Sequence, residues 1–139
     1  MDLTKKPIPK SILIFGAAGH IGQPLAEFLT RGAPDIQLSL VARNPEKQKM
    51  LQNKFPNARV LAADYEDPSS LAAAVKGIEG VFVISSSGMS ETSAMTNLTR
   101  ALKEDDSTIH VIRFLGIFPD FNPHRVPSNS LITESTVTV

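Results

Sequence analysis

The sequence contains no cysteine and no tryptophan, and it has a single tyrosine among its 139 residues. Without cysteine the chain forms no disulfide, no thiolate metal site and no cysteine nucleophile, and this composition suits a reducing compartment. Its 14 basic residues balance its 14 acidic ones, so charge offers no case for a nucleic-acid surface. The apolar run near the N-terminus is too short for a signal-peptide core or a membrane span. We therefore expect a cytoplasmic protein without nucleic-acid or membrane partners.

The length predicts one domain with a single core. Residues 1–10 are polar, contain two prolines and are expected to be a flexible leader, followed by the main domain over residues 11–115. The tail over residues 116–139 contains three prolines and is expected to be irregular. Its last residues alternate weakly between apolar and polar. This pattern is compatible with an extra strand beside the fifth strand and also with a disordered tail.

The most informative stretch is residues 11–22, which read Ser-Ile-Leu-Ile-Phe-Gly-Ala-Ala-Gly-His-Ile-Gly. The apolar run over residues 12–15 is typical of a parallel strand buried on both faces. Small residues then provide a sharp turn, and a helical stripe follows at Ile21, Leu25, Phe28 and Leu29. A strand, a glycine turn and a helix in succession place backbone N–H groups and the positive end of a helix dipole at one spot, which suits a phosphate.

The glycines of this turn, Gly16, Gly19 and Gly22, are spaced as G-x-x-G-x-x-G, whereas the general dinucleotide fingerprint G-x-G-x-x-G has a glycine where Ala18 stands. Gly16 fits the tight turn, Gly19 the close approach of a pyrophosphate and Gly22 the packing of the helix near the strand. The alternative is a glycine-rich turn that binds nothing. The buried strand before the turn and the amphipathic helix after it favour the nucleotide interpretation.

The rest of the chain alternates between strand and helix signals. Further strands are expected at residues 36–42, 58–63, 81–84 and 109–115. Helices are expected from Pro45 to about Phe55, from Pro68 to Gly77, and after the serine-rich loop at residues 85–90, with Ala94, Leu98, Ala101 and Leu102 on the inner face of the last. Asn44 and Asp67 are expected N-caps, and Gly32 and Gly77 are expected to end helices. This rhythm predicts a doubly wound parallel α/β sheet of Rossmann type, with about five strands in the order 3-2-1-4-5 flanked by helices.

These residues resemble the NmrA-like branch of the atypical short-chain dehydrogenase/reductase superfamily, which binds NAD(P). The resemblance covers residues 11–115 and is carried by Gly-Ala-Ala-Gly-His-Ile-Gly at 16–22, Val-Ala-Arg-Asn-Pro at 41–45, Asp64 with Asp67, and Gly-Val-Phe-Val-Ile at 80–84. It implies that a dinucleotide binds at the glycine turn. The cofactor-binding candidates there are Gly16, Ala18, Gly19, His20, Ile21 and Gly22, with His20 as a loop residue beside the pyrophosphate.

Arg43 bears on the choice of dinucleotide. An acidic side chain after the second strand holds the ribose hydroxyls of NAD, whereas an arginine there accepts the extra phosphate of NADP. Asp35 precedes that strand and so lies at its wrong end. Arg43 therefore predicts NADP, with NAD less favoured, although a solvated surface arginine is the alternative. Asn44 either shares the phosphate contact or only caps the following helix.

Three further positions are candidates on the cofactor side of the sheet. The resemblance implies a contact between Asp64 and the adenine amino group. The alternative, which is equally open, is that Asp64 is only an acidic loop residue that precedes a helix. Tyr65 either packs on the adenine edge or fills a surface groove. Ser85, Ser86 and Ser87 either hydrogen-bond the nicotinamide ribose or form a flexible polar loop.

Catalytic residues are not identified by the sequence. The superfamily pairs a tyrosine with a lysine four positions later, as a general acid/base and its charged neighbour, but the residue four positions after Tyr65 is Ser69. No metal site is expected. Members of the family also continue past a fifth strand into a region that forms the substrate pocket.

Three functions stay open: an oxidoreductase relative that uses NADP(H), a non-catalytic NADP-sensing regulatory protein, and a truncated cofactor-binding module without activity. An open edge on the fifth strand, with apolar surface near Val111, Phe114 and Phe118, would also favour self-association.

Overall fold

The computed structural model describes residues 7–84 and 90–114. Within them, five strands form one parallel sheet in the order β3-β2-β1-β4-β5. The strands are β1 (Ser11–Ile14), β2 (Gln37–Val41), β3 (Arg59–Leu61), β4 (Gly80–Val83) and β5 (His110–Arg113). The doubly wound α/β sheet and its strand order are therefore confirmed. The predictions for the start of the leader, for Ser85, Ser86 and Ser87, and for the tail lie outside the described residues.

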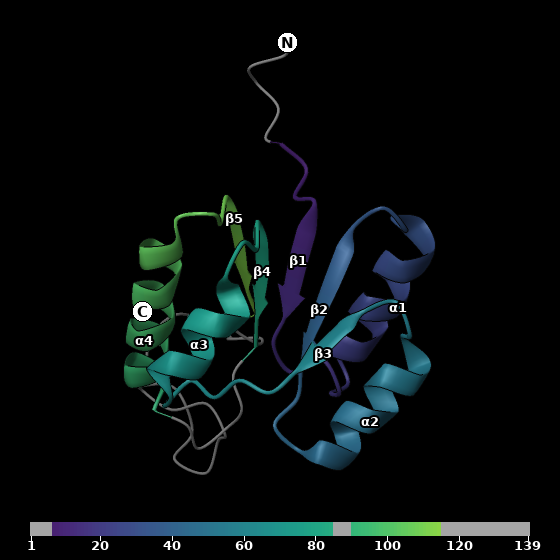
Figure 1. Ribbon diagram of the computed structural model, residues 1–139, viewed down its shortest axis with the longest axis horizontal. Helices are drawn as coiled ribbons and strands as arrows, with labels where there is room; N and C mark the ends of the chain where they lie inside the picture. Colours follow the sequence, from purple (N-terminus) through teal and green to yellow (C-terminus); the bar gives the residue numbers. More distant parts are fainter. Residues whose placement is uncertain (1–6, 85–89, 115–139) are drawn as a thin grey trace, which may run out of the picture.

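Four helices cover the sheet from its two faces (Figure 1). They are α1 (Gly22–Gly32), α2 (Pro45–Lys54), α3 (Pro68–Val75) and α4 (Glu91–Asp105). One buried cluster lies on the side of α1 and α2 and includes Ile14, Leu40 and Leu51. The other lies on the side of α3 and α4 and includes Leu13, Leu71 and Leu98. Neighbouring residues of β1 thus point into opposite cores, which explains why its sequence is an unbroken apolar run.

The helix boundaries follow their local signals at most ends. The Asn44 side chain accepts the Glu46 N–H at 2.8 Å and caps α2, and the Asp67 carboxylate accepts the Ser69 N–H at 3.1 Å and caps α3. Gly77, with φ +72°, follows α3 as expected. The prediction that α1 ends at Gly32 is confirmed, but Gly32 is the last helical residue and not the C-cap, which is Ala33.

The predicted inner face of α1 is wrong at one position. Phe28 is 72% exposed, whereas Gly22 and Ala26 are buried and Leu25 and Leu29 pack against the same core. Residue 28 lies two positions from Ala26, and in a helix with 3.6 residues per turn this places it on another side. Small residues face the sheet here, so α1 approaches it closely.

Strand β5 forms the edge of the described sheet and is only partly covered. Val111 and Ile112 are 48% and 51% exposed. The Arg113 side chain points toward α4 and pairs with buried Glu91 at 2.7 Å. This ion pair joins the beginning of α4 to the end of β5, so the two elements are fixed to each other at the carboxyl end of the sheet.

Candidate functional site

A pocket of about 420 Å³ lies at the carboxyl ends of strands β1 to β4. Its walls come from the turns that follow β1, β2 and β3 and from the residue after β4. The lining residues are Phe15, Gly16, Ala18, Gly19, Val41, Ala42, Arg43, Asn44, Lys47, Ala63, Tyr65 and Ile84. In open α/β sheets, ligands bind in this crevice, where the strand order reverses.

The first wall is the glycine turn between β1 and α1. Gly16 has φ +66°, a conformation that L side chains rarely adopt, and a Cβ at this position would collide with the Ile84 side chain. A Cβ at Gly22 would collide with the Gly16 carbonyl oxygen and lie 2.8 Å from Cα of Ala17. At Gly19 a Cβ would lie 3.3 Å from the Gly16 carbonyl oxygen. The turn therefore requires glycine at 16 and 22, and it leaves its backbone open to a ligand.

Helix α1 begins at this turn without a side-chain cap. Its N-cap residue is Ile21, whose side chain carries no acceptor for the N–H groups of the first turn. The Gln23 N–H donates to the Gly19 carbonyl at 3.1 Å, and the positive end of the helix dipole at this turn favours an anion. Ala18 and Gly19 line the pocket, whereas His20 is exposed and does not line it.

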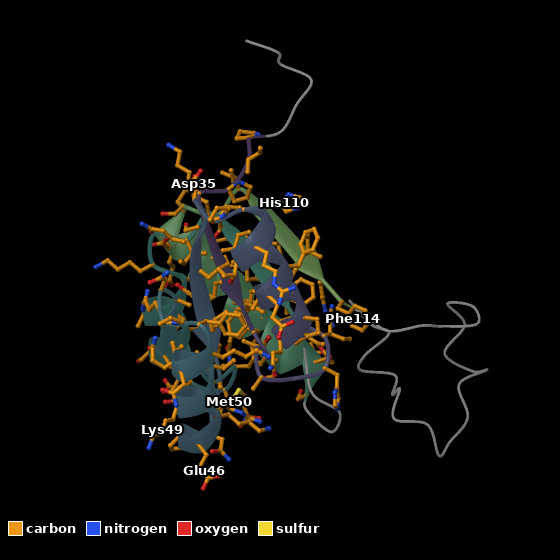
Figure 2. The ribbon with its side chains drawn as sticks, turned by 90° about the vertical axis from the view of Figure 1, so that its right-hand side faces the viewer. Asp35, Glu46, Lys49, Met50, His110 and Phe114 are labelled. Carbon is orange, nitrogen blue, oxygen red and sulfur yellow. The ribbon has the colours of Figure 1, made fainter. Side chains whose placement is uncertain are left out.

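The second wall carries positive charge. Arg43 and Lys47 both line the pocket and are exposed, and Asn44 lies between them as the cap of α2. Lys47 was not among the residues predicted from the sequence. A signal for it was present, because Lys47 stands in the first turn of α2, where the helix dipole disfavours a cation. Asp35, rejected as a ribose ligand, lies at the opposite end of the molecule from Glu46 at the start of α2 (Figure 2).

The third wall is formed by the segment after β3. The Asp64 carboxylate accepts the Glu66 N–H at 2.9 Å, and its backbone N–H donates to the Ser70 hydroxyl at 3.0 Å. Asp64 does not line the pocket, although its neighbours Ala63 and Tyr65 do. The structure thus brings Tyr65 to the glycine turn and leaves the Asp64 carboxylate engaged by its own loop.

Tyr65 is buried, with 6% of its surface exposed. Its ring stacks on Phe15 with centroids 4.8 Å apart, and its hydroxyl donates to the Ile84 carbonyl at 3.1 Å. Burial raises the pKa of the phenol far above its usual value, the negative charge of Glu91 raises it further, and Arg113 partly offsets this. The phenol therefore stays protonated over the physiological pH range.

Other surface features carry less chemistry. A groove of about 640 Å³ runs along α4 beside β5, and it is lined by Glu91, Thr92, Met95, Thr96, Thr99, Arg100, Lys103, Glu104 and Arg113. It lies away from the glycine turn. In residues 7–84 and 90–114 no three His, Asp or Glu side chains are placed to hold a metal ion. No helix in the same ranges has the length and apolar character needed to cross a membrane.

Residues 16–128 match the protein family described as NAD(P)H-binding. The chain belongs to this family, and its Rossmann domain is related to atypical short-chain dehydrogenase/reductases of the NmrA-like type. The family match begins at the first glycine of the turn. The pocket geometry is consistent with it, since Gly16, Ala18 and Gly19 of the turn line the crevice in which such folds bind dinucleotides.

Similarity to individual proteins supports the same family assignment. Quinone oxidoreductase 2 of Escherichia coli (strain K12) is 37% identical over 76 residues, which are 55% of this chain and 26% of that protein. The NADPH complex of the E. coli quinone oxidoreductase QOR2 superimposes with a TM-score of 0.61 at 30% identity, over 71% of this chain and 35% of that one. Triphenylmethane reductase of Citrobacter sp., complexed with NADP(H), gives a TM-score of 0.64 at 26% identity, over 73% and 36%. The chain thus spans between a quarter and about a third of these relatives.

Proposed function

We propose that this chain binds NADP(H) as the cofactor-binding domain of an oxidoreductase. The observation that carries the proposal is the pair of exposed cations, Arg43 and Lys47, lining the same pocket as the glycine turn. A cation after the second strand suits the 2′-phosphate that distinguishes NADP from NAD. Relatives whose structures hold NADP(H) or NADPH support this choice.

The remaining contacts follow from the arrangement of the walls. The pyrophosphate would lie against the turn formed by Gly16, Ala18, Gly19, His20, Ile21 and Gly22, where the positive end of the α1 dipole favours its charge. The adenine would lie between the turns after β2 and β3, beside Tyr65. The proposal includes the predicted contact of Asp64 with the adenine. It also includes the predicted contact of Ser85, Ser86 and Ser87 with the nicotinamide ribose. Hydride transfer is chemistry of the cofactor, and the chain would bind and orient it.

Calorimetric titration tests the choice of cofactor. NADPH and NADH would each be titrated into the wild-type chain and into an Arg43→Ala variant. A charge-assisted contact contributes about 1.5 kcal/mol or more, so we expect the variant to bind NADPH roughly tenfold more weakly. NADH, which has no 2′-phosphate, should bind the variant and the wild type equally.

Arg31→Ala is the matched control, because Arg31 is exposed in the last turn of α1, away from the pocket. This variant should bind both dinucleotides as the wild type does. If Arg43→Ala weakened the binding of NADPH and of NADH equally, the proposed contact between Arg43 and the 2′-phosphate would be contradicted. A chain that is folded by circular dichroism and binds neither dinucleotide would overturn the proposal as a whole.

The reaction is tested by NADPH oxidation. Since one relative is named a quinone oxidoreductase, a simple benzoquinone is the first electron acceptor to try. A second candidate is a non-catalytic NADP sensor, favoured by the state of Tyr65, the sole tyrosine of the chain, whose hydroxyl is buried and bonded to a carbonyl. Binding without turnover over a panel of quinones and dyes would favour the sensor.

We also propose that the chain self-associates through β5. The support is the apolar surface at the edge of the described sheet, where Ile112 and Phe114 are 51% and 42% exposed. An edge strand offers unpaired backbone groups to a second strand, and apolar side chains on it add burial. The cytoplasmic location expected from the sequence stays part of the proposal.

A further inference from the structure

Tyr65 contacts three segments that are far apart in the sequence, two of which line the pocket. Its ring stacks on Phe15, at the end of β1, with an interplanar angle of 22°. Its hydroxyl donates to the Ile84 carbonyl, just after β4. Its own carbonyl accepts the side-chain amide of Asn97, on α4, at 2.9 Å. Both the side chain and the backbone carbonyl of Tyr65 are therefore fixed by contacts with other segments.

Ile84 stands at a special place in the sheet. Strand β4 adjoins β1 on the side opposite to β2, so the end of β4 lies where the strand order reverses and where a dinucleotide crosses from one half of the sheet to the other. The Ile84 side chain lies against Gly16, and both line the pocket. A shift of the Ile84 backbone would therefore change the pocket wall directly beside the glycine turn.

We propose that Tyr65 is a positioning residue for dinucleotide binding: its hydroxyl fixes the Ile84 carbonyl and so sets the β4 wall of the pocket before the ligand arrives. The inference rests on the proposed function and adds a role that the stacking of an aromatic ring alone does not supply. Without the hydroxyl, the Ile84 carbonyl loses its donor, and the ligand must order this wall on binding.

The proposal separates the two halves of the ligand. Adenosine 2′,5′-bisphosphate carries only the adenine half and the 2′-phosphate, so it reaches the walls made by β1, β2 and β3. NADPH also crosses to β4. We therefore expect Tyr65→Phe, which keeps the ring and its stacking, to weaken NADPH binding about fivefold, the factor that corresponds to one neutral hydrogen bond. Binding of the bisphosphate should change less than about twofold.

Thr108→Val is the matched control. Thr108 donates its hydroxyl to the Ile78 carbonyl at 2.8 Å, before β4 begins and so at the other end of that strand. The variant removes an equivalent hydroxyl–carbonyl bond without touching the pocket, and it should bind both ligands as the wild type does. Equal weakening of both ligands by Tyr65→Phe, or no weakening of either, would overturn the positioning role.

A readout without ligand separates this inference from the proposed function. The amides of Phe15 and Phe114 donate to the carbonyls of Phe82 and Val83 at 3.0 and 2.9 Å, next to Ile84 in the chain. If the Tyr65 hydroxyl fixes the end of β4, both amides should exchange about fivefold faster in Tyr65→Phe than in Thr108→Val. Unchanged exchange would overturn the role. A wild-type chain that binds neither ligand would overturn the proposed function, whatever the exchange rates.

The wild-type chain carries its own spectroscopic probe. Because it has one tyrosine and no tryptophan, its fluorescence reports on Tyr65 alone. Saturating NADPH should quench this emission, since the bound ligand lies against the pocket wall that contains Tyr65. Emission unchanged at a ligand concentration that calorimetry shows to be saturating would contradict the placement of Tyr65 beside the ligand.

Discussion

Gly22, the first residue of α1, packs directly against the Gly16 turn, and a Cβ at Gly22 would lie 2.8 Å from Cα of Ala17. The atoms in the way belong to the backbone, so they cannot be displaced by rotating a side chain. The beginning of α1 and the turn that precedes it therefore form one rigid unit, on which the shape of the pocket depends.

Substitution of Gly22 tests this unit. Gly22→Ala should lower the free energy of unfolding by about 1–3 kcal/mol, because the added carbon forces α1 away from the turn. It should also abolish dinucleotide binding. Gly32→Ala is the control, since the space around Gly32 is open, and it should be neutral or slightly stabilising because alanine favours the helix. Urea unfolding of both variants checks the prediction, and equal stabilities would contradict it.

Lys47 and Lys49 are neighbours on α2 with different surroundings. Lys47 lines the pocket, whereas Lys49 is exposed and does not. Lys47→Ala should weaken NADPH binding by about 1 kcal/mol, as expected for loss of an exposed contact to phosphate, and the effect should shrink at high salt. Lys49→Ala should leave it unchanged. Calorimetry at two salt concentrations tests this prediction. A similar loss of affinity in both variants would contradict it, because the loss would then follow from the net charge of the chain and not from a contact between Lys47 and the phosphate.

The buried phenol of Tyr65 makes stability depend on alkaline pH. Its pKa is raised in the folded chain, so the unfolded chain, with an ordinary pKa of about 10, loses the proton first. The stability that depends on this proton is fully present below about pH 10 and falls as the pH rises from there through the raised pKa. Tyr65→Phe lacks this loss. Urea midpoints measured between about pH 9 and 11 should therefore fall more steeply for the wild type, and parallel curves would contradict the assignment.

The exposed edge of the sheet predicts association of the free chain. Ile112→Lys places a charge in the middle of β5, where it should oppose pairing with a second strand. Met50→Lys is the control, because Met50 is 37% exposed on α2 and lies far from Phe114 at the end of β5 (Figure 2). Sedimentation velocity should show concentration-dependent association of the wild type and Met50→Lys but not of Ile112→Lys. A wild-type chain that stays monomeric at high concentration would contradict the proposal.

Local signals were sufficient for most elements. Asn44 with Pro45 and Asp67 with Pro68 mark two helix beginnings, because a side-chain oxygen and a missing N–H each satisfy a local need of the first turn. Gly77 ends α3 because it adopts a positive φ. Phe28 was predicted wrongly for the opposite reason, because the face of α1 that touches the sheet depends on tertiary packing.

The sequence by itself determined that this protein is a doubly wound α/β domain with a glycine turn after its first strand, because apolar runs, caps and glycines act within a few residues of one another. Only the tertiary structure decided which side chains share the pocket. Lys47 reaches it through the direction of α2, the Asp64 carboxylate is held by its own loop, and Tyr65 joins Phe15 to Ile84. The contacts of Tyr65 depend on strands that are adjacent in the sheet but distant in the chain, and no local sequence pattern specifies which strands become neighbours.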